Sequence, residues 1–251
     1  MYAIPHLMTE KAREASEEIR RFAEQTLGEM PEVINQLFKL DGDAAVEQFT
    51  ENNILYLGRN NLPRKVLALI AMSVALANGP KESAMIHFKL AKRFEASNEE
   101  ILDAIRTAKM ALVSSTLDAV ASVIDSGKEE LLERDPNSSV VLEKVRLESG
   151  IVPERLYLAA SFSGSLLREH LREKGELLRS RALERKYVFA IALAVSISIH
   201  DMGCQKVYLD QFTRNGGTRA ELEDVMSVTR FITGSMAFVN ALDVLRLMNS
   251  S

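Results

Sequence analysis

The sequence contains one cysteine and four histidines, and two of these five residues are spaced to meet polar partners on a helix. His87 lies four residues after Ser83, so the two side chains share a helix face and a hydroxyl–imidazole hydrogen bond is feasible. Cys204 lies near a predicted helix start, where the helix dipole favours a thiolate, although Asp201 one turn earlier opposes it. Tyr208 follows four residues later and either hydrogen-bonds the thiol or simply packs. The candidate chemistry is therefore that of a thiolate or an imidazole.

Each candidate also has a structural interpretation. A lone cysteine often behaves as a small hydrophobic residue, and a histidine on an amphipathic helix is often structural. A Ser–His pair without an orienting carboxylate is not a nucleophile system. Glu82 is a further candidate acid, but it lies five residues before His87, about 140° around the helix. His6, His170 and His200 have no sequence context that suggests a role.

Composition excludes several classes of protein. A net charge of −4 provides no basic excess for phosphates, so nucleic acid is not an expected partner. A single cysteine forms no internal disulfide, which favours the cytoplasm. Four scattered histidines and one cysteine form no metal-ligand pattern, and we expect neither a metal nor a cofactor. The most apolar run, residues 187–199, is too short to span a bilayer, so no membrane partner is expected.

Helical periodicity recurs along the chain and no alternating strand pattern is present, which predicts an all-α fold. Breakers and caps place first-half helices over residues 9–27, 31–40, 44–57, 63–78, 81–94 and 98–113, with another up to 125. The apolar helices 63–78 and 185–199 are expected at the buried centre. The charge runs at 17–21 and 168–174 are expected to be solvated helix faces. Five methionines at core-like spacings are expected to pack inside: Met72, Met85, Met110, Met226 and Met236.

The same order of helices, breakers and caps occurs twice. Gly28 and Pro31 correspond to Gly150 and Pro153, an offset of 122 (153 − 31). From Arg64-Lys65 and Arg185-Lys186 onward the offset is 121 (185 − 64), and the helix-capping pair Ser97…Glu100 corresponds to Thr218…Glu221. This pattern predicts a tandem duplication, with an N-terminal unit at 1–126, a connector at 127–146 and a C-terminal unit at 147–251. The alternative is an ordinary helical bundle with coincidental helix lengths.

Both halves contain a long apolar helix, a turn, a helix with a possible reactive residue, and a helix that begins Thr/Ser-x-x-Glu. The segments that carry this pattern are 62–65, 79–87 and 97–101 in the first half, and 185–186, 200–208 and 216–221 in the second. The pattern resembles the alkylhydroperoxidase D / carboxymuconolactone decarboxylase superfamily over residues of about 25–126 and 147–248. The resemblance implies two tandem copies of the superfamily's helical unit around a pseudo-two-fold axis.

The peroxidase branch of this superfamily uses Cys-x-x-Cys-x-x-x-His and a relay Glu on the preceding helix, and the resemblance maps these positions onto this chain. The three motif positions fall at Pro80, Ser83 and His87 in the first half and at Asp201, Cys204 and Tyr208 in the second, and the relay Glu falls at Ala68 and Phe189. Neither half is complete and no resolving cysteine exists, so disulfide exchange of the family type is not expected.

The decarboxylase branch needs no cysteine and resembles the first half better, with Glu82 and His87 where that branch carries an acid and a histidine. A positioned histidine is able to protonate the carbanion left by loss of carbon dioxide. Lys81, Lys89 or Arg64 are candidates to bind an anionic substrate. The resemblance also implies a homo-oligomer, with a trimer favoured because a duplicated chain imitates a hexamer of single units.

Two hypotheses of different classes follow. One is an enzyme with residual peroxidase, antioxidant or decarboxylase-like chemistry on a small molecule, using His87 in one half and Cys204 in the other. This hypothesis gains if the pockets of the two halves meet. The alternative is a non-catalytic protein that binds a small molecule or forms an oligomeric assembly. Retention of the His and the Cys favours the first, and loss of the relay Glu and the cysteine pair favours the second.

Overall fold

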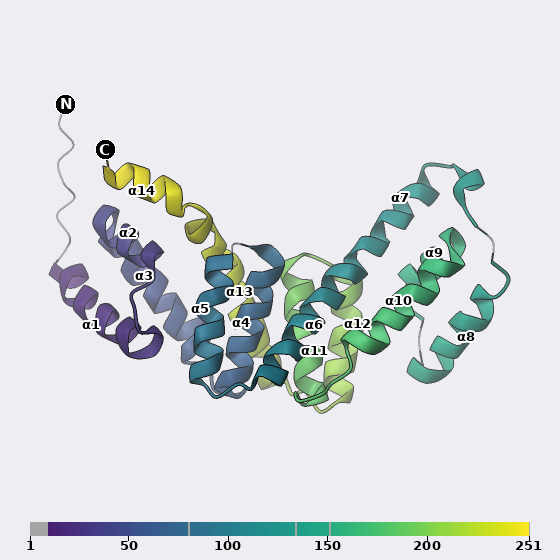
Figure 1. Cartoon of the computed structure of the whole chain (residues 1–251), viewed down its shortest axis with the longest axis horizontal. Helices are drawn as coiled ribbons and strands as arrows, with labels where there is room; N and C mark the ends of the chain where they lie inside the picture. Colours follow the sequence, from purple (N-terminus) through teal and green to yellow (C-terminus); the bar gives the residue numbers. More distant parts are fainter. Residues whose placement is uncertain (1–9, 80, 134, 151, 251) are drawn as a thin grey trace. The chain divides into compact units, whose positions relative to one another are not determined.

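The computed structural model describes residues 10–79, 81–133, 135–150 and 152–250, and all regular elements in these ranges are helical (Figure 1). The predicted all-α fold is confirmed. The first repeat contains α1 (Glu10–Leu27), α2 (Glu32–Leu40), α3 (Gly42–Asn52), the π-helical η1 (Asn53–Leu57), α4 (Arg64–Asn78), α5 (Lys81–Arg93), α6 (Asn98–Ser115), the 3₁₀ turn η2 (Thr116–Asp118) and α7 (Ala119–Asp125). After a 3₁₀ turn η3 (Glu129–Leu131), the second repeat contains α8 (Ser138–Ser149), α9 (Glu154–Phe162), α10 (Gly164–Leu177), α11 (Arg185–Ser198), α12 (Met202–Arg214), α13 (Arg219–Asn240) and α14 (Leu242–Ser250).

The two repeats agree in their turns and caps. Gly28 and Gly150 both have a positive φ, of 80° and 78°, in the turn that precedes α2 or α9. In both capping boxes the predicted reciprocal bonds form: Ser97 and Glu100 cap α6, and Thr218 and Glu221 cap α13. These shared local solutions agree with the predicted duplication.

The connector between the repeats is shorter than the interval predicted for it at 127–146. Helix α8 begins at Ser138 and occupies the place in the second repeat that α1 occupies in the first. Leu142 of α8 is buried, with Val141 and Val145 packed against the same apolar cluster. Charged and turn-forming residues around α8 made its apolar face hard to recognise in the sequence.

The apolar helices form the buried centre of their units, as predicted. Every residue of α4 from Val66 to Ala75 is buried, and so is every residue of α11 from Val188 to Ser196. Met72, Met110 and Met236 are also buried.

The core assignment was wrong for two methionines. Met85 is 51% exposed and Met226 is 49% exposed. Met85 lies about 200° around α5 from the buried His87, on the opposite side of the helix. At Met85, the spacing that predicted a core residue therefore belongs to a second apolar face of α5, and that face is exposed.

The compact units in space do not coincide with the sequence repeats. One unit consists of residues up to Ile101 together with Thr218–Ser251, and the other consists of Leu102–Gly217. In the first unit, α1–α5 pack with α13 and α14 of the second repeat. The second unit contains α8–α12 together with α7 and most of α6. Each unit therefore combines the early helices of one repeat with the late helices of the other.

In each unit, a buried aspartate anchors a helix that comes from the other repeat. Asp224 of α13 accepts hydrogen bonds from the backbone amides of Asn61 (2.8 Å) and Leu62 (2.9 Å) and pairs with Arg59 at 2.7 Å. Burial alone would raise the pKa of Asp224, but these hydrogen bonds hold it below its ordinary value.

Asp103 of α6 plays the same part in the second unit. One of its carboxylate oxygens accepts hydrogen bonds from the backbone amides of Arg181, Ala182 and Leu183, at 2.8–3.1 Å. Burial again opposes the charge, and the three amides again lower the pKa. Asp103 and Asp224 occupy equivalent positions in the two repeats, so the anchor is part of the duplicated design.

One helical run among the described residues, Asn98–Asp125, is long and apolar enough to cross a membrane by length and composition. The bent pair α13–α14 passes the same test when it is taken as one span. Core helices of soluble proteins also meet these criteria, so this finding does not by itself indicate a membrane protein.

Candidate functional site

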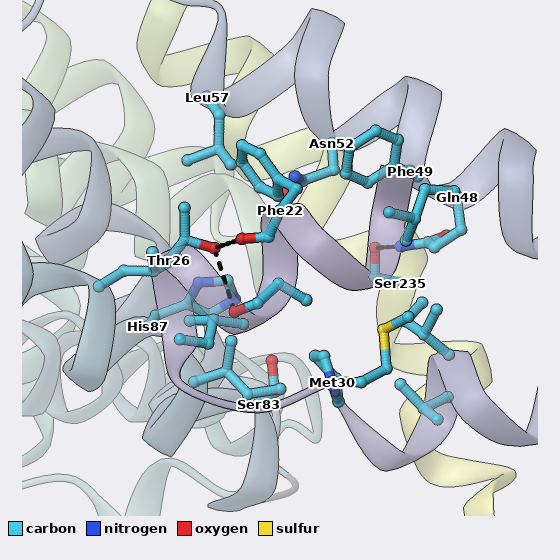
Figure 2. A pocket seen from close by; sticks show the side chains of 18 of the residues that line it. Phe22, Thr26, Met30, Gln48, Phe49, Asn52, Leu57, Ser83, His87 and Ser235 are labelled. Carbon is cyan, nitrogen blue, oxygen red and sulfur yellow. Dashed lines mark hydrogen bonds between the residues drawn. The ribbon is translucent and has the colours of Figure 1, made fainter. Parts of the chain in front are cut away.

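A cavity of about 120 Å³ lies in the first unit beside His87 (Figure 2). Helices α1, α2, α3 and α5 form its walls together with α13 of the second repeat. Most of its lining is apolar, with Phe22, Phe49 and Phe231 among the larger side chains. A cavity of about 150 Å³ with walls of this kind is able to hold one benzene molecule. The cavity therefore suits a small, mostly apolar molecule.

His87 has a buried ring nitrogen whose hydrogen bonding is incomplete. Three other polar side chains in the lining have partners: Thr26 donates to the carbonyl of Phe22 at 2.7 Å, and Gln48 donates to Ser235 at 2.6 Å. The imidazole of His87 is 7% exposed, and its Nδ1 is buried without a hydrogen-bond partner among the described residues. Since an unpaired buried polar atom costs about 1–3 kcal/mol, Nδ1 is available to a ligand.

Burial lowers the pKa of His87 to about 3, so its imidazole is neutral at neutral pH. The ring of Tyr56 packs edge-on against it at 5.5 Å between centroids and limits its rotation. Ser83 lies one turn before His87, is buried and lines the same cavity, as the spacing predicted. Glu82 is exposed and is absent from the lining, so it is not a partner of His87 in this cavity.

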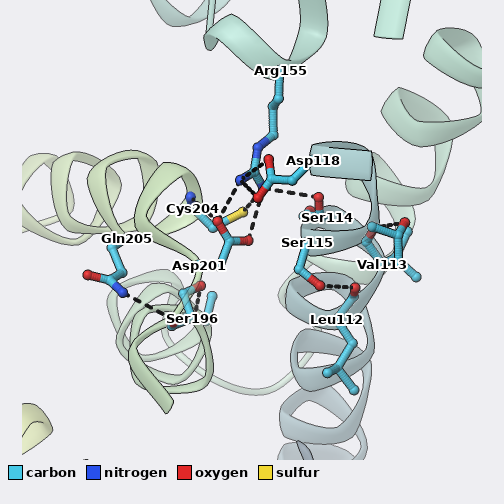
Figure 3. A network of polar contacts seen from close by, with 12 residues as sticks. Leu112, Val113, Ser114, Ser115, Asp118, Arg155, Ser196, Asp201, Cys204 and Gln205 are labelled. Carbon is cyan, nitrogen blue, oxygen red and sulfur yellow. Dashed lines mark hydrogen bonds and ion pairs between the residues drawn. The ribbon is translucent and has the colours of Figure 1, made fainter. Parts of the chain in front are cut away.

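Cys204 belongs to a buried polar network in the second unit (Figure 3). Asp201 caps α12 by accepting a hydrogen bond from the Cys204 amide at 2.9 Å. Arg155 of α9 forms a two-pronged ion pair with Asp201, at 2.5 and 2.9 Å, and also bonds Cys204 Sγ at 2.9 Å and Asp118 at 2.9 Å. Gly203 permits this arrangement, because a Cβ at that position would collide with the guanidinium of Arg155.

This network disfavours a reactive thiolate. Cys204 is 5% exposed, and burial raises its pKa to about 12, because the nearby Arg155 only partly offsets the loss of water and Asp201 adds to the rise. The cavity beside the thiol measures only about 20 Å³, which is little more than the room for one water molecule.

We expect iodoacetamide to alkylate Cys204 slowly between pH 6 and 9, at a rate that is still rising at pH 9 and shows no plateau, because the raised pKa keeps most of the thiol protonated over this range. Intact-mass detection over that pH range measures this directly. The urea-unfolded chain is the control, and its rate should be higher and should level off above the free-cysteine pKa of about 8.5. A folded-state rate that levels off below pH 8 would instead establish a reactive thiolate.

The cavity beside Cys204 is the second-repeat counterpart of the His87 cavity. Cys204 occupies the position of Ser83, and Tyr208 occupies that of His87, both at the offset of 121. At the offset of 122, the cavity residues Val33, Gln48 and Asn52 of the first unit are replaced by Arg155, His170 and Lys174. One fold position thus carries an apolar and neutral lining in one unit and a largely basic lining in the other.

Sequence reasoning missed Arg155, His170 and Lys174. His170 is 5% exposed and lines the Cys204 cavity, although its sequence neighbours indicated no role. The charge run that contains Arg168, Arg172 and Lys174 was expected to be a solvated face. Arg168 and Arg172 are exposed, but all three residues line a cavity. Aligning the two repeats position by position was the signal that would have found them.

The structure places the remaining candidates apart from one another. His87 and Cys204 lie in different compact units and line separate cavities that share no residue. Ala68 and Phe189, at the relay positions, are buried in α4 and α11. Pro80 and His6 lie outside the described residues. His200 is exposed and has a positive φ of 59° at the position where the first repeat has Gly79, so it forms the turn before α12.

The fold and the cavities described above define an all-helical protein built from a tandem repeat, with a small-molecule-sized cavity in the first unit. The sequence model of the carboxymuconolactone decarboxylase family matches residues 43–125 and again residues 168–247. The chain belongs to the carboxymuconolactone decarboxylase family. The double match also confirms the tandem duplication.

One solved structure shows the same fold over nearly the whole chain. It comes from Burkholderia xenovorans LB400 and is described, provisionally, as a gamma-carboxymuconolactone decarboxylase subunit. The TM-score is 0.79 at 16% sequence identity, and the match covers 94% of this chain and 98% of that chain. A comparison with curated proteins gave no match.

Proposed function

We propose that the protein binds a small, largely apolar molecule in the His87 cavity and that His87 recognises the single polar group of that molecule. The observation that carries this proposal is the buried Nδ1 of His87, which has no hydrogen-bond partner among the described residues and belongs to a side chain that lines a mostly apolar cavity of about 120 Å³. A ligand of this type fills the cavity with apolar surface and restores the missing hydrogen bond.

Phenol is a suitable probe because it combines a benzene-sized ring with one hydroxyl. We expect phenol to bind the wild-type protein with one site per chain and to shift the ¹⁵N resonances of the His87 ring. His87→Leu should weaken phenol at least tenfold, because the hydroxyl then has no partner, while toluene should change by less than threefold. Calorimetry and histidine ¹⁵N NMR measure the two effects.

His170→Leu is the matched control, since it alters the buried histidine of the other unit and should leave phenol binding unchanged. Circular dichroism checks that each variant is folded. Equal affinities of wild type and His87→Leu for phenol would contradict the proposal, and so would wild-type protein that binds toluene but not phenol.

Decarboxylation is a second candidate function. It rests on family membership, on the description of the related structure, and on His87 at the family's histidine position. The low pKa of His87 makes it a poor proton donor, and a carboxylate held beside it would raise that pKa. Release of carbon dioxide from gamma-carboxymuconolactone by wild type, and none by His87→Gln, would establish this function.

Several observations weigh against a peroxidase or antioxidant role. Cys204 has a raised pKa, its cavity is too small for an organic hydroperoxide, and the sequence contains no second cysteine. A thiolate is the required nucleophile of that chemistry. A protonated, enclosed thiol therefore favours the non-redox proposal.

We also propose a cytoplasmic homo-oligomer, with a trimer favoured. Exposed apolar side chains on α5, α6 and α13 support self-association, including Met85, Ile105 and Met226. The related solved chain is described as a subunit. The single cysteine and the absence of a basic excess support a cytoplasmic protein that does not bind nucleic acid.

A further inference from the structure

A second and larger cavity lies in the Leu102–Gly217 unit, next to the one that contains Cys204. It measures about 970 Å³, and the two cavities share Lys174, Val207 and Tyr208. Helices α8, α10, α11 and α12 contribute its walls. Its volume lies near the upper end of the range of about 300–1,000 Å³ for small-molecule sites.

The charge of this lining is one-sided. Seven of the lining residues are basic, and no Asp or Glu is among the described residues that line it. The other six besides Lys174 are Lys144, Arg168, Arg172, Arg179, Arg185 and Arg214. A concave surface with one sign of charge and low-dielectric walls concentrates ligands of the opposite charge.

Three of these cations are partly neutralised by acids outside the lining. Arg168 pairs with Asp135 at 2.5 Å, and exposed ion pairs join Arg172 to Glu169 and Arg214 to Asp210. The pairs of Arg172 and Arg214 are exposed and contribute little energy, so a stronger anion competes with them at small cost.

The other cations include three that lack an acidic partner among the described residues. Lys174 is half-buried, has no ion pair or side-chain hydrogen bond there, and reaches both cavities. Burial lowers its pKa, which reflects the cost of an uncompensated charge. Arg179 is exposed and unpaired, and the guanidinium of Arg185 lies over the Phe189 ring at 5.6 Å.

A buried imidazole with incomplete hydrogen bonding lies beside Lys174. His170 Nδ1 has no hydrogen-bond partner among the described residues, and the ring is 5% exposed in the wall of the small cavity beside Lys174. In the first unit the equivalent residue, Gln48, is satisfied by Ser235. Where the first unit has a hydrogen-bonded neutral pair, the second unit therefore has the imidazole of His170, with one nitrogen unpaired among the described residues, beside Lys174.

We propose that this basic cavity is a second ligand site, which binds a small molecule carrying two or more phosphate or carboxylate groups. Lys174, beside the His170 imidazole, holds the innermost anionic group, and Arg179 and Arg185 hold the outer ones. Guanidinium groups match the planar oxygen pairs of both anion types. The site is distinct from the His87 cavity of the proposed function, and either can exist without the other.

Titration calorimetry at a fixed ionic strength of about 0.15 M tests this, with inorganic tripolyphosphate and citrate as probes. We expect one of them to bind with one site per chain at micromolar to low-millimolar concentration. Binding of tripolyphosphate alone identifies a phosphate ligand, and binding of citrate alone identifies a carboxylate ligand. Absence of binding by both at several millimolar overturns the proposal.

Substitutions decide whether the cavity itself carries the binding. Lys174→Gln and Arg185→Gln should each weaken the bound probe at least tenfold, while Lys174→Arg should retain most of the affinity. Arg64→Gln is the matched control, because Arg64 is the first-repeat counterpart of Arg185 and also lies over a phenylalanine ring, that of Phe94, at 5.7 Å. Equal losses in Arg64→Gln and Arg185→Gln would show unspecific attraction to the surface and overturn the site.

Two further readouts separate this site from the other. Phenol binding at His87 should be the same in Lys174→Gln as in wild type. Circular dichroism of each variant establishes that it is folded, and Lys174→Arg provides a binding result if Lys174→Gln does not fold. Loss of affinity in both Lys174 variants, with the fold intact, would exclude a simple requirement for a positive charge at that position.

Discussion

Replacing Arg155 by methionine is expected to lower the free energy of unfolding by about 3–5 kcal/mol, the range found when one partner of a buried ion pair is removed. Arg155 and Asp201 are 8% and 1% exposed at their side chains, and their two short contacts are supported by Cys204 and Asp118. Methionine fills a similar volume but leaves the carboxylate of Asp201 buried without its cation. Urea denaturation monitored by circular dichroism measures the change.

Arg172→Met is the control for this experiment. Arg172 pairs with Glu169 at the same distance of 2.5 Å, but both side chains are more than half exposed. Its loss should cost less than about 0.5 kcal/mol, as for other exposed pairs within a helix. The double variant Arg155→Met with Asp201→Leu should recover much of the lost stability, since the buried carboxylate is then removed together with its cation and Asp118 is more than half exposed. An Arg155→Met cost below about 1 kcal/mol would show that the network is not a stabilising element.

Asp224→Asn is expected to lower the free energy of unfolding by about 2–4 kcal/mol at pH 7. The carboxylate is buried and accepts bonds from the Asn61 and Leu62 amides and from Arg59. An amide group at this position loses the charge and turns one acceptor into a donor that faces other donors. The contact between α13 and the loop before α4 should therefore be weakened.

The pH dependence of this loss has a definite sign. The folded state holds the pKa of Asp224 below its ordinary value of 3.8, so its contribution is complete above about pH 4 and is lost as the pH falls through the folded pKa. The difference in stability between wild type and Asp224→Asn should therefore shrink between pH 4 and pH 2. Denaturation curves across that range measure it.

Asp243→Asn is the control for the aspartate experiment, because Asp243 forms an ion pair with Arg246 but has an 89% exposed side chain. Its stability should stay within about 0.5 kcal/mol of wild type at pH 7. A loss for Asp224→Asn that is no larger than this, or that stays constant down to pH 2, would contradict the anchoring role.

Much of the fold was readable because its signals are local. The apolar runs that became α4 and α11, the glycines at Gly28 and Gly150, and the two capping boxes each depend on a few neighbouring residues. Local signals of this kind fix where helices begin and end. Repetition of the same signals after about 121 residues then revealed the duplication.

The candidate site was readable only in part. Ser83 and His87 lie together as predicted because their spacing on one helix sets their neighbourhood. The sequence did not decide whether Cys204 is a thiol or a thiolate, because the dipole of its helix favours the thiolate and the nearby Asp201 disfavours it. Burial, a property of the whole unit, decided it.

The sequence by itself determined the helical class, the repeat, the caps and the residues that replace the family's motif. Only the tertiary structure decided that the late helices of each repeat complete the unit of the other, and that His87 and Cys204 occupy separate cavities. Only the tertiary structure also gathered Arg155, His170 and Lys174 around one thiol. The physical reason is that helix formation depends on residues within a few positions, whereas burial, cavity shape and pKa depend on contacts between residues far apart in the chain.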